Sequence, residues 1–242
     1  MERLYEKIDT STFARKLIIE SKGIFADHLG IFANPDTRPS TVEYSEYGTV
    51  PELRLKHIFN RYDNISNYFE KLILIKSFLN AEDAEEFCKN NSIDEIKYYQ
   101  YHLENFIIRL VGLLDLCAKL GNEVYNLGLS DRSCNRFTFT NDSQLVGKEC
   151  ITILNEFFVY LDTLVTDRHI IVHAGGYTSS VVESIESRII NNDLIEMTEL
   201  LTEWFSEQKT AEIVKLVEEV DDKINHALEF VFNFLDSMES DL

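Results

Sequence analysis

The sequence predicts an all-α protein, built as an up-and-down helical bundle with additional N-terminal helices. The 242 residues include only three prolines and nine glycines, and a chain with so few helix-breaking residues favours long helices. Apolar residues recur at helical spacing through most of the sequence, and the apolar fraction of 45% is enough for a sizeable core. Strand-like alternation is confined to the run Phe-Thr-Phe-Thr at 137–140, which we expect to form a short strand.

Residues 1–91 are expected to form an N-terminal helical extension packed on the bundle. A first helix is predicted over residues 11–32, because the run Asp-Thr-Ser-Thr at its start offers N-caps. The segment 34–52 contains all three prolines and is expected to be a loop. Helical periodicity resumes over residues 52–79, and a short helix is expected over residues 81–90.

Residues 92–242 are expected to form the bundle itself. Its first long helix is predicted over residues 92–128, with Ser92 as the N-cap and Asp94 in the first turn. Several apolar residues of this helix recur at the spacing of a single helix face, which predicts a packing seam. They are Phe106, Leu110, Leu113, Cys117, Leu120 and Val124.

The rest of the bundle follows a polar segment, 129–142, which is expected to be irregular apart from the short strand. One long helix is predicted over residues 143–174 and is ended by the glycine pair 175–176. Residues 179–239 are predicted to form two or three acidic amphipathic helices.

Composition restricts the classes of function. The net charge of −19, from 23 basic and 42 acidic side chains, opposes a role in coating nucleic acid. The cysteines show neither CxxC spacing nor histidines at zinc-ligand spacing, so we expect reduced thiols and no structural metal. They are Cys88, Cys117, Cys134 and Cys150. The sequence has no signal-peptide pattern and no apolar run of membrane-span length, which predicts a cytoplasmic protein without membrane contact.

The stretch Asp-Arg-His-Ile-Ile-Val-His-Ala-Gly-Gly-Tyr, residues 167–177, places polar side chains where a buried helix is predicted. Counted at about 100° per residue, Arg168 falls inside the apolar stripe of the 143–174 helix, and Ile170 points nearly the opposite way. A helix that is apolar on both sides is usually buried all round. An unpaired guanidinium there costs several kcal/mol, so Arg168 needs an anion or strong acceptors.

Three arrangements satisfy this requirement. In the first, Arg168 forms a structural ion pair with a carboxylate on a facing helix, such as Asp115 or Glu104. In the second, Arg168 and the nearby histidines His169 and His173 line a water-filled cleft that receives an anionic group. In the third, the second apolar face is a subunit interface, and the polar residues lie along its seam.

His169 and His173 are four residues apart, so they share one side of the helix. This spacing also suits two metal ligands, and Asp162 lies on nearly the same face. A lone HxxxH pair is frequent by chance, and no HExxH motif or second carboxylate cluster accompanies it. We therefore expect neither a metal nor another cofactor at this place.

The string Arg168-His169-Ile170-Ile171-Val172-His173 is an R-x4-H motif late in a helix of an apolar bundle. In this setting the chain resembles the HEPN superfamily, over roughly residues 92–239. HEPN domains are all-α bundles, commonly dimeric, and many are metal-independent endoribonucleases. The resemblance implies that Arg168 and His173 are the catalytic pair and that His169 helps to orient them.

The resemblance also implies that the motifs of two protomers meet in a composite cleft. Arg168 and His173 are about 140° apart around a straight helix, so they do not converge easily within one chain. A dimer seam, or a local break before residue 175, would let them meet. There an imidazole would move the proton of a ribose 2′-OH, and the guanidinium would stabilise charge on the phosphorus centre. The product would be a 2′,3′-cyclic phosphate, formed without a metal.

Three hypotheses follow. The first is a homodimeric, metal-independent endoribonuclease that acts in bacterial stress or defence. The alternative is a non-catalytic HEPN-like module that binds a nucleotide or a protein and dimerises, which suits the acidic charge better. The third is a plain helical adaptor in which Arg168 is a buried ion-pair partner. The tyrosine-rich run Lys-Tyr-Tyr-Gln-Tyr at 97–101 suits base stacking or the packing of a helix junction, and the junction is favoured.

Overall fold

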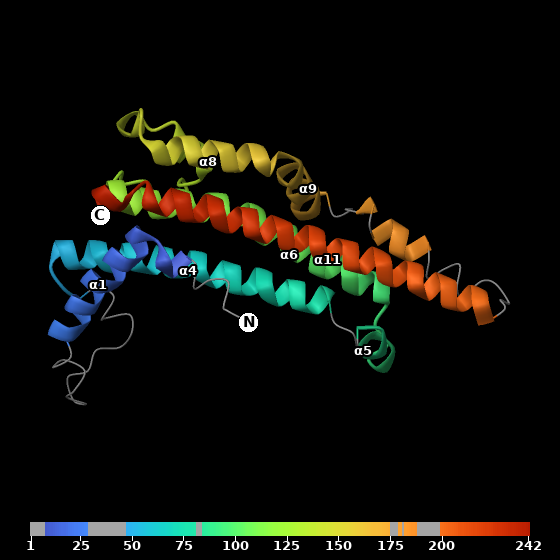
Figure 1. The fold of residues 1–242 in the computed structure, drawn as a ribbon. Helices are drawn as coiled ribbons and strands as arrows, with labels where there is room; N and C mark the ends of the chain where they lie inside the picture. Colours follow the sequence, from blue (N-terminus) through green and yellow to red (C-terminus); the bar gives the residue numbers. More distant parts are fainter. Residues whose placement is uncertain (1–7, 29–46, 81–83, 175–178, 181, 188–198) are drawn as a thin grey trace. The chain divides into compact units, whose positions relative to one another are not determined.

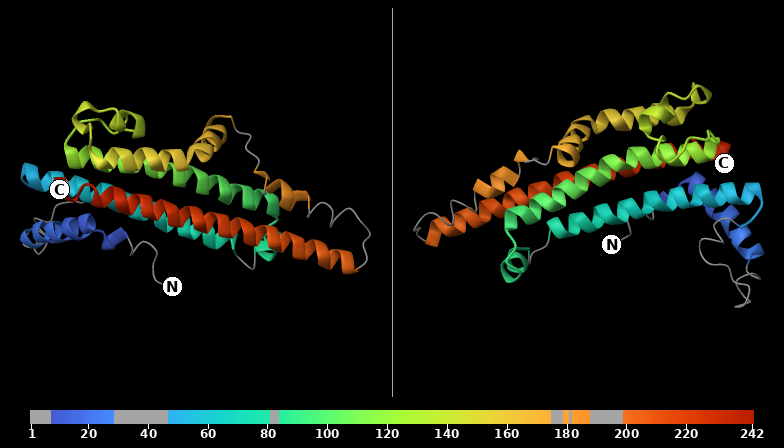
Figure 2. Two further views of the ribbon diagram at one scale, coloured as in Figure 1. Left: turned by 45° about the horizontal axis from the view of Figure 1, so that its top comes forward. Right: turned by 180° about the vertical axis from the view of Figure 1, so that it is seen from behind.

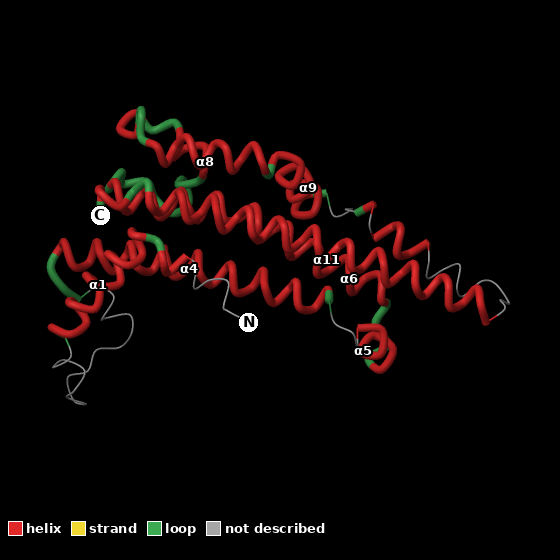
Figure 3. The backbone as a smooth tube through the Cα atoms, viewed as in Figure 1, coloured by secondary structure: helices red, strands yellow, loops and turns green. Residues whose placement is uncertain are grey.

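The computed structural model describes most of the chain, and every regular element in the described residues is helical (Figures 1 and 3). The described ranges are 8–28, 47–80, 84–174, 179–180, 182–187 and 199–242. The predicted all-α class is confirmed. Within these ranges no helix is both long enough and apolar enough to cross a membrane.

The chain divides into two compact units. Unit 1 comprises Met1–Tyr68, Gly112–Tyr160 and Leu228–Leu242, and unit 2 comprises Phe69–Val111 and Leu161–Ala227. The long helices α4 (Val50–Leu79), α6 (Glu95–Tyr125) and α11 (Glu199–Asp236) each contribute residues to both units.

In unit 1, α1 (Thr12–Asp27) lies beside the C-terminal end of α11 (Figure 2). Ser11 caps α1, because its Oγ accepts a hydrogen bond from the backbone N–H of Ala14 at 3.1 Å. Asp236 of α11 accepts a second one from the backbone N–H of Thr12 at 2.8 Å. The helix predicted over residues 11–32 therefore exists, and residues 29–32 lie outside the described ranges.

The helix α4 begins slightly before the predicted position and contains Pro51 in its first turn, where a missing N–H costs nothing. The carboxylate of Glu52 accepts a hydrogen bond from the backbone N–H of Thr49 at 2.6 Å, and hydrogen bonding from Thr49 lowers the pKa of Glu52. Most of the predicted 34–52 loop lies outside the described residues.

The packing seam predicted on α6 is confirmed, because all six of its apolar residues are at most 1% exposed. The predicted N-cap is wrong. Ser92 adopts a positive φ of 55°, and its N–H bonds back to the carbonyl of Lys89 at 3.3 Å. Asp94 caps α6 instead, since its Oδ1 accepts the N–H of Ile96 at 2.9 Å.

The short strand expected at 137–140 is wrong, because these residues belong to α7 (Arg136–Thr140). Asn135 and Thr138 form a reciprocal capping box that favours a helical turn. The ring of Phe139, fully buried, occupies the space above Gly121 of α6, where a Cβ would overlap it. Local capping and one buried ring therefore decide against an extended conformation.

The long helix expected over residues 143–174 is interrupted twice. A short 3-10 turn, η2 (Ser143–Leu145), is separated from α8 (Glu149–Tyr160) by Gly147, whose φ of +81° favours glycine. Leu161 then departs from helical geometry, with φ −93° and ψ 5°, before α9 (Asp162–His173) begins. Ala174 caps the end of α9, and the glycine pair 175–176 lies outside the described residues.

In unit 2, Lys209 of α11 joins two other elements. Its ammonium contacts Glu85 of α5 (Ala84–Asn90) at 2.7 Å and Glu95 of α6 at 3.3 Å. Burial opposes the charge of Lys209, but the two carboxylates outweigh it and raise the pKa of the ammonium. This ion-pair cluster fixes α5 against the beginning of α6. Of the predicted C-terminal helices, residues 182–187 and α11 are helical, and 188–198 lie outside the described residues.

Candidate functional site

The R-x4-H motif lies on α9 in unit 2. No residue of α9 is buried, and Val172 is 52% exposed, so the expectation of a helix buried all round is wrong. The break at Leu161 explains the difference, because face positions counted along one continuous helix do not carry into α9. The motif is therefore on an accessible helix.

Arg168 is half-buried, and its Nε is buried without a hydrogen-bond partner. Within the described part of the chain, Arg168 forms no ion pair. Of the two carboxylates considered as partners, Glu104 accepts from Gln100 at 3.0 Å, and Asp115 accepts the backbone N–H of Arg136 at 3.1 Å. A buried donor without an acceptor costs about 1–3 kcal/mol.

His169 and His173 are both exposed, and their ring centroids are 4.8 Å apart at an interplanar angle of 49°. The prediction that they share one side of the helix is confirmed. His173 lies in the last turn of α9. Both rings are accessible to a ligand from solvent.

The structure brings the two histidines together but leaves Arg168 apart from His173. No hydrogen bond or ring contact joins Arg168 to His173 within the described chain. This agrees with their separation of about 140° around a helix. Within the described residues, the two side chains that the resemblance pairs are thus not joined by a direct contact.

Asp162 does not complete a metal site with the two histidines, and no group of three candidate ligands occurs among the described residues. The four cysteines are free and buried. Burial raises the pKa of Cys134 to about 11 and also raises the pKa of Cys117, which disfavours the reactive thiolate.

Two cations of unit 1, Arg136 and Lys148, are engaged in structural contacts. The guanidinium of Arg136 stacks on the ring of Phe158 at 3.7 Å, and Lys148 pairs with Asp241 at 2.7 Å. The carboxylate of Asp241 offsets the positive charge of Lys148, whereas Arg136 keeps its charge but is held against the ring.

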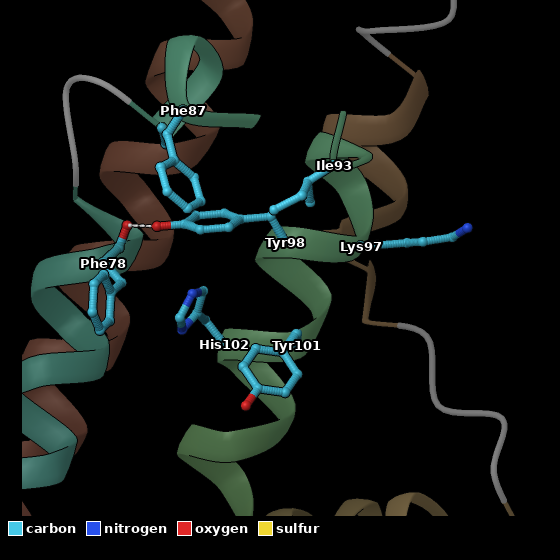
Figure 4. A pocket seen from close by; sticks show the side chains of 8 residues that line it. Phe78, Phe87, Ile93, Lys97, Tyr98, Tyr101 and His102 are labelled. Atoms are coloured by element: carbon cyan, nitrogen blue, oxygen red, sulfur yellow. Dashed lines mark hydrogen bonds between the residues drawn. The ribbon is translucent and has the colours of Figure 1, made fainter. Parts of the chain in front are cut away.

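A second feature of unit 2 is a pocket of about 540 Å³ between the end of α4, α5 and the start of α6 (Figure 4). We name it the aromatic pocket. The residues that line it are Phe78, Ala84, Phe87, Ile93, Lys97, Tyr98, Tyr101 and His102. For the tyrosine-rich run at 97–101, the sequence favoured a helix junction and did not predict this pocket. Tyr98 and Tyr101 line the pocket, whereas Tyr99 packs in the core at 2% exposure.

Comparison with known proteins defines the class of the chain. A family model described as Cthe2314-like HEPN matches residues 50–238, which is more than half of the sequence. The chain therefore belongs to the HEPN superfamily, as the R-x4-H motif predicted. No curated protein and no solved structure matches the sequence. The family match begins at α4 and so extends beyond the 92–239 region of resemblance, while the domain boundary at residue 91 stays a prediction.

Proposed function

We propose that this HEPN protein is a metal-independent endoribonuclease in which Arg168 and His173 are catalytic and His169 orients them. The observation that carries the proposal is the buried Nε of Arg168, which has no acceptor although it lies one residue from an exposed histidine pair. A phosphate of RNA would supply the missing acceptor through charge-assisted hydrogen bonds. Exposed imidazoles beside it would supply proton transfer.

The proposed site is composite and belongs to a homodimer. Because Arg168 and His173 make no contact within one chain, Arg168 of one protomer would act with His173 of the other. A twofold axis places the same helix of both protomers at one interface, so two equivalent sites arise. The half-buried position of Arg168 suits a residue at the edge of such an interface.

The proposed reaction is an intramolecular transesterification. His173 removes the proton of a ribose 2′-OH, and the 2′-oxygen attacks the adjacent phosphorus. The P–O5′ bond breaks, and the leaving 5′-oxygen takes a proton from an imidazolium or from water. Arg168 stabilises the charge that accumulates on the phosphorus-bound oxygens. The products are a 2′,3′-cyclic phosphate and a 5′-hydroxyl end, and no metal takes part.

The test is cleavage of single-stranded and structured RNA by the purified protein with EDTA present. We expect cleavage by the wild type and at least about a hundredfold loss in His173→Ala, since general acid–base catalysis contributes that much. His226→Ala is the matched control, because His226 is another exposed histidine of unit 2 and lies outside the motif. Folding of each variant is checked by circular dichroism. Equal cleavage by wild type and His173→Ala would overturn the proposal.

A second function, a non-catalytic module that binds a nucleotide or protein and dimerises, is favoured by the net charge of −19. Such a charge slows and weakens the approach of a polyanion. Calorimetric titration with a nucleoside triphosphate distinguishes the two functions. Binding that Arg168→Ala abolishes, together with intact RNA in every assay, would assign the site to binding alone. The cytoplasmic location and the role in stress or defence remain predictions.

A further inference from the structure

We propose that the aromatic pocket binds a flat aromatic molecule carrying one carboxylate, with the rings of the protein against the ligand ring and the carboxylate at the mouth near Lys97. The pocket lies within unit 2 and takes no residue from α9. Its volume of about 540 Å³ is in the range that small-molecule sites occupy. The proposal stands independently of ribonuclease activity.

The walls of the pocket are apolar, yet they are open to water. Phe78 is 42% exposed, Phe87 49%, and Tyr101 63%. A contiguous patch of exposed apolar surface is typical of a ligand-binding groove or an interaction site, whereas single exposed apolar residues are ordinary. Their grouping on three different elements therefore indicates a binding site rather than scattered surface residues.

The pocket is held in shape before a ligand arrives. The hydroxyl of Tyr98 donates a hydrogen bond to the carbonyl of Phe78 at 3.0 Å, which joins α6 to the end of α4 (Figure 4). The ammonium of Lys209 on α11 pairs with Glu85 of α5 and with Glu95 of α6, and so holds these two helices together. A preformed site spends less free energy on ordering its walls when the ligand binds.

The ring contacts favour an aromatic ligand. His102 stacks on Phe78 with centroids 5.0 Å apart, and it meets Tyr98 edge-on at 4.5 Å and Tyr101 at 5.4 Å. Burial lowers the pKa of His102, so the neutral imidazole is favoured beside the rings. These faces and edges offer offset-stacked and T-shaped positions to a further flat ring.

The few polar groups of the pocket favour a ligand with an apolar ring over a nucleobase. The hydroxyl of Tyr98 is already engaged, which leaves His102 and the rim hydroxyl of Tyr101 for hydrogen bonding. A nucleobase has several donors and acceptors on its edge, and this lining would leave most of them without partners. A ligand with an apolar ring and a single polar group avoids that cost.

Lys97 favours a ligand with a negative charge. Its stem lines the pocket, and its ammonium extends away from the rings into solvent (Figure 4). The side chain is 79% exposed, and its nearest acid, Asp94, is 4.0 Å away. A cation at the mouth disfavours an ammonium ligand among the rings, and it is free to turn toward a carboxylate.

The test uses 2-naphthoate as the probe and its neutral analogue 2-naphthamide, measured by calorimetry on the full chain. We expect one 2-naphthoate per chain and about tenfold weaker binding or more in Phe87→Ala, as loss of a ring contact predicts. Lys97→Gln should weaken 2-naphthoate about two- to fivefold and leave 2-naphthamide unchanged, since the charge pair is exposed. Ile19→Ala is the control, because Ile19 is 69% exposed on α1, outside the pocket.

Phe87 is half-exposed, so its truncation is expected to preserve folding, and Tyr101→Ala provides a second variant if it does not. Failure of 2-naphthoate to bind at millimolar concentration, or equal binding by wild type and both pocket variants, would overturn the proposal. Equal weakening of acid and amide by Lys97→Gln would overturn the assignment of an anion. Loss of self-association in Phe87→Ala, seen by sedimentation without 2-naphthoate binding, would assign the pocket to a second copy instead.

Discussion

The imidazole rings of His169 and His173 lie 4.8 Å apart on the exposed surface of α9. They are four positions apart on the helix, so the two rings are neighbours on one side of it. We propose that this contact limits the rotamers of His173, the histidine proposed as the proton-transfer group. His169 is thus a positioning residue in the proposed site.

His169→Ala is expected to reduce RNA cleavage about tenfold or more, because a loosely held general base transfers protons less efficiently. His169→Asn keeps a polar side chain at the same place and should recover part of the activity. The measurement is the cleavage rate as a function of pH for the three proteins. A rate and pH profile unchanged in His169→Ala would contradict the positioning role.

Arg168→Ala is expected to change the free energy of unfolding by less than about 1 kcal/mol, because Arg168 has no ion-pair partner to leave behind. Breaking a buried ion pair would instead cost about 3–5 kcal/mol. Urea unfolding of wild type and Arg168→Ala distinguishes the two. A loss in the larger range would show that Arg168 is a structural ion-pair partner, as in the adaptor hypothesis.

Gly121→Ala is expected to destabilise the protein by about 1–3 kcal/mol, since the new methyl would overlap the buried ring of Phe139. Gly23→Ala is the matched substitution, because Gly23 is also helical and has nothing within 4 Å of its added Cβ. It should stabilise the protein by about 0.5–1 kcal/mol through helix propensity. Thermal unfolding of both variants checks the pair, and equal effects would contradict the packing of α7 on α6.

His102 predicts a dependence of stability on pH. Burial lowers its pKa in the folded state, so the unfolded chain binds more protons as the pH falls below about 6.5. The free energy of unfolding is therefore not reduced by His102 well above that pH. It falls on acidification until the pH reaches the pKa of His102 in the folded state. His102→Gln should reduce this loss on acidification below about pH 6.5, as measured by denaturant unfolding. An identical pH dependence in the variant would contradict the inference.

The sequence predicted best those helices in which apolar residues recur at helical spacing over many turns. The seam of α6 was readable because one face of a long helix repeats at fixed spacing, and all of its members are buried. By contrast, the break at Leu161 carries no proline or glycine signal, and the capping box of Asn135 and Thr138 overrides an alternating pattern. Short-range hydrogen bonding and the contact of Phe139 with Gly121 decided those segments.

For the candidate site, the motif and the shared side of its histidines could be read from spacing alone. The exposure of α9 could not, since it depends on where the helix ends and on tertiary packing. The aromatic pocket could not be predicted from the sequence either. Phe78 and Phe87 are separated in sequence from the tyrosine-rich run, and only the folding of α4 and α5 onto α6 brings these side chains together.

The central claim is most directly tested by mixing two inactive variants, Arg168→Ala and His173→Ala, and assaying RNA cleavage in EDTA after the subunits have exchanged. In a twofold dimer with composite sites, a mixed dimer has one site with both side chains intact, so about a quarter of the wild-type activity should return. Each variant alone should remain inactive. A mixture that stays inactive while the wild type cleaves, with subunit exchange verified, would contradict a cleft shared between protomers.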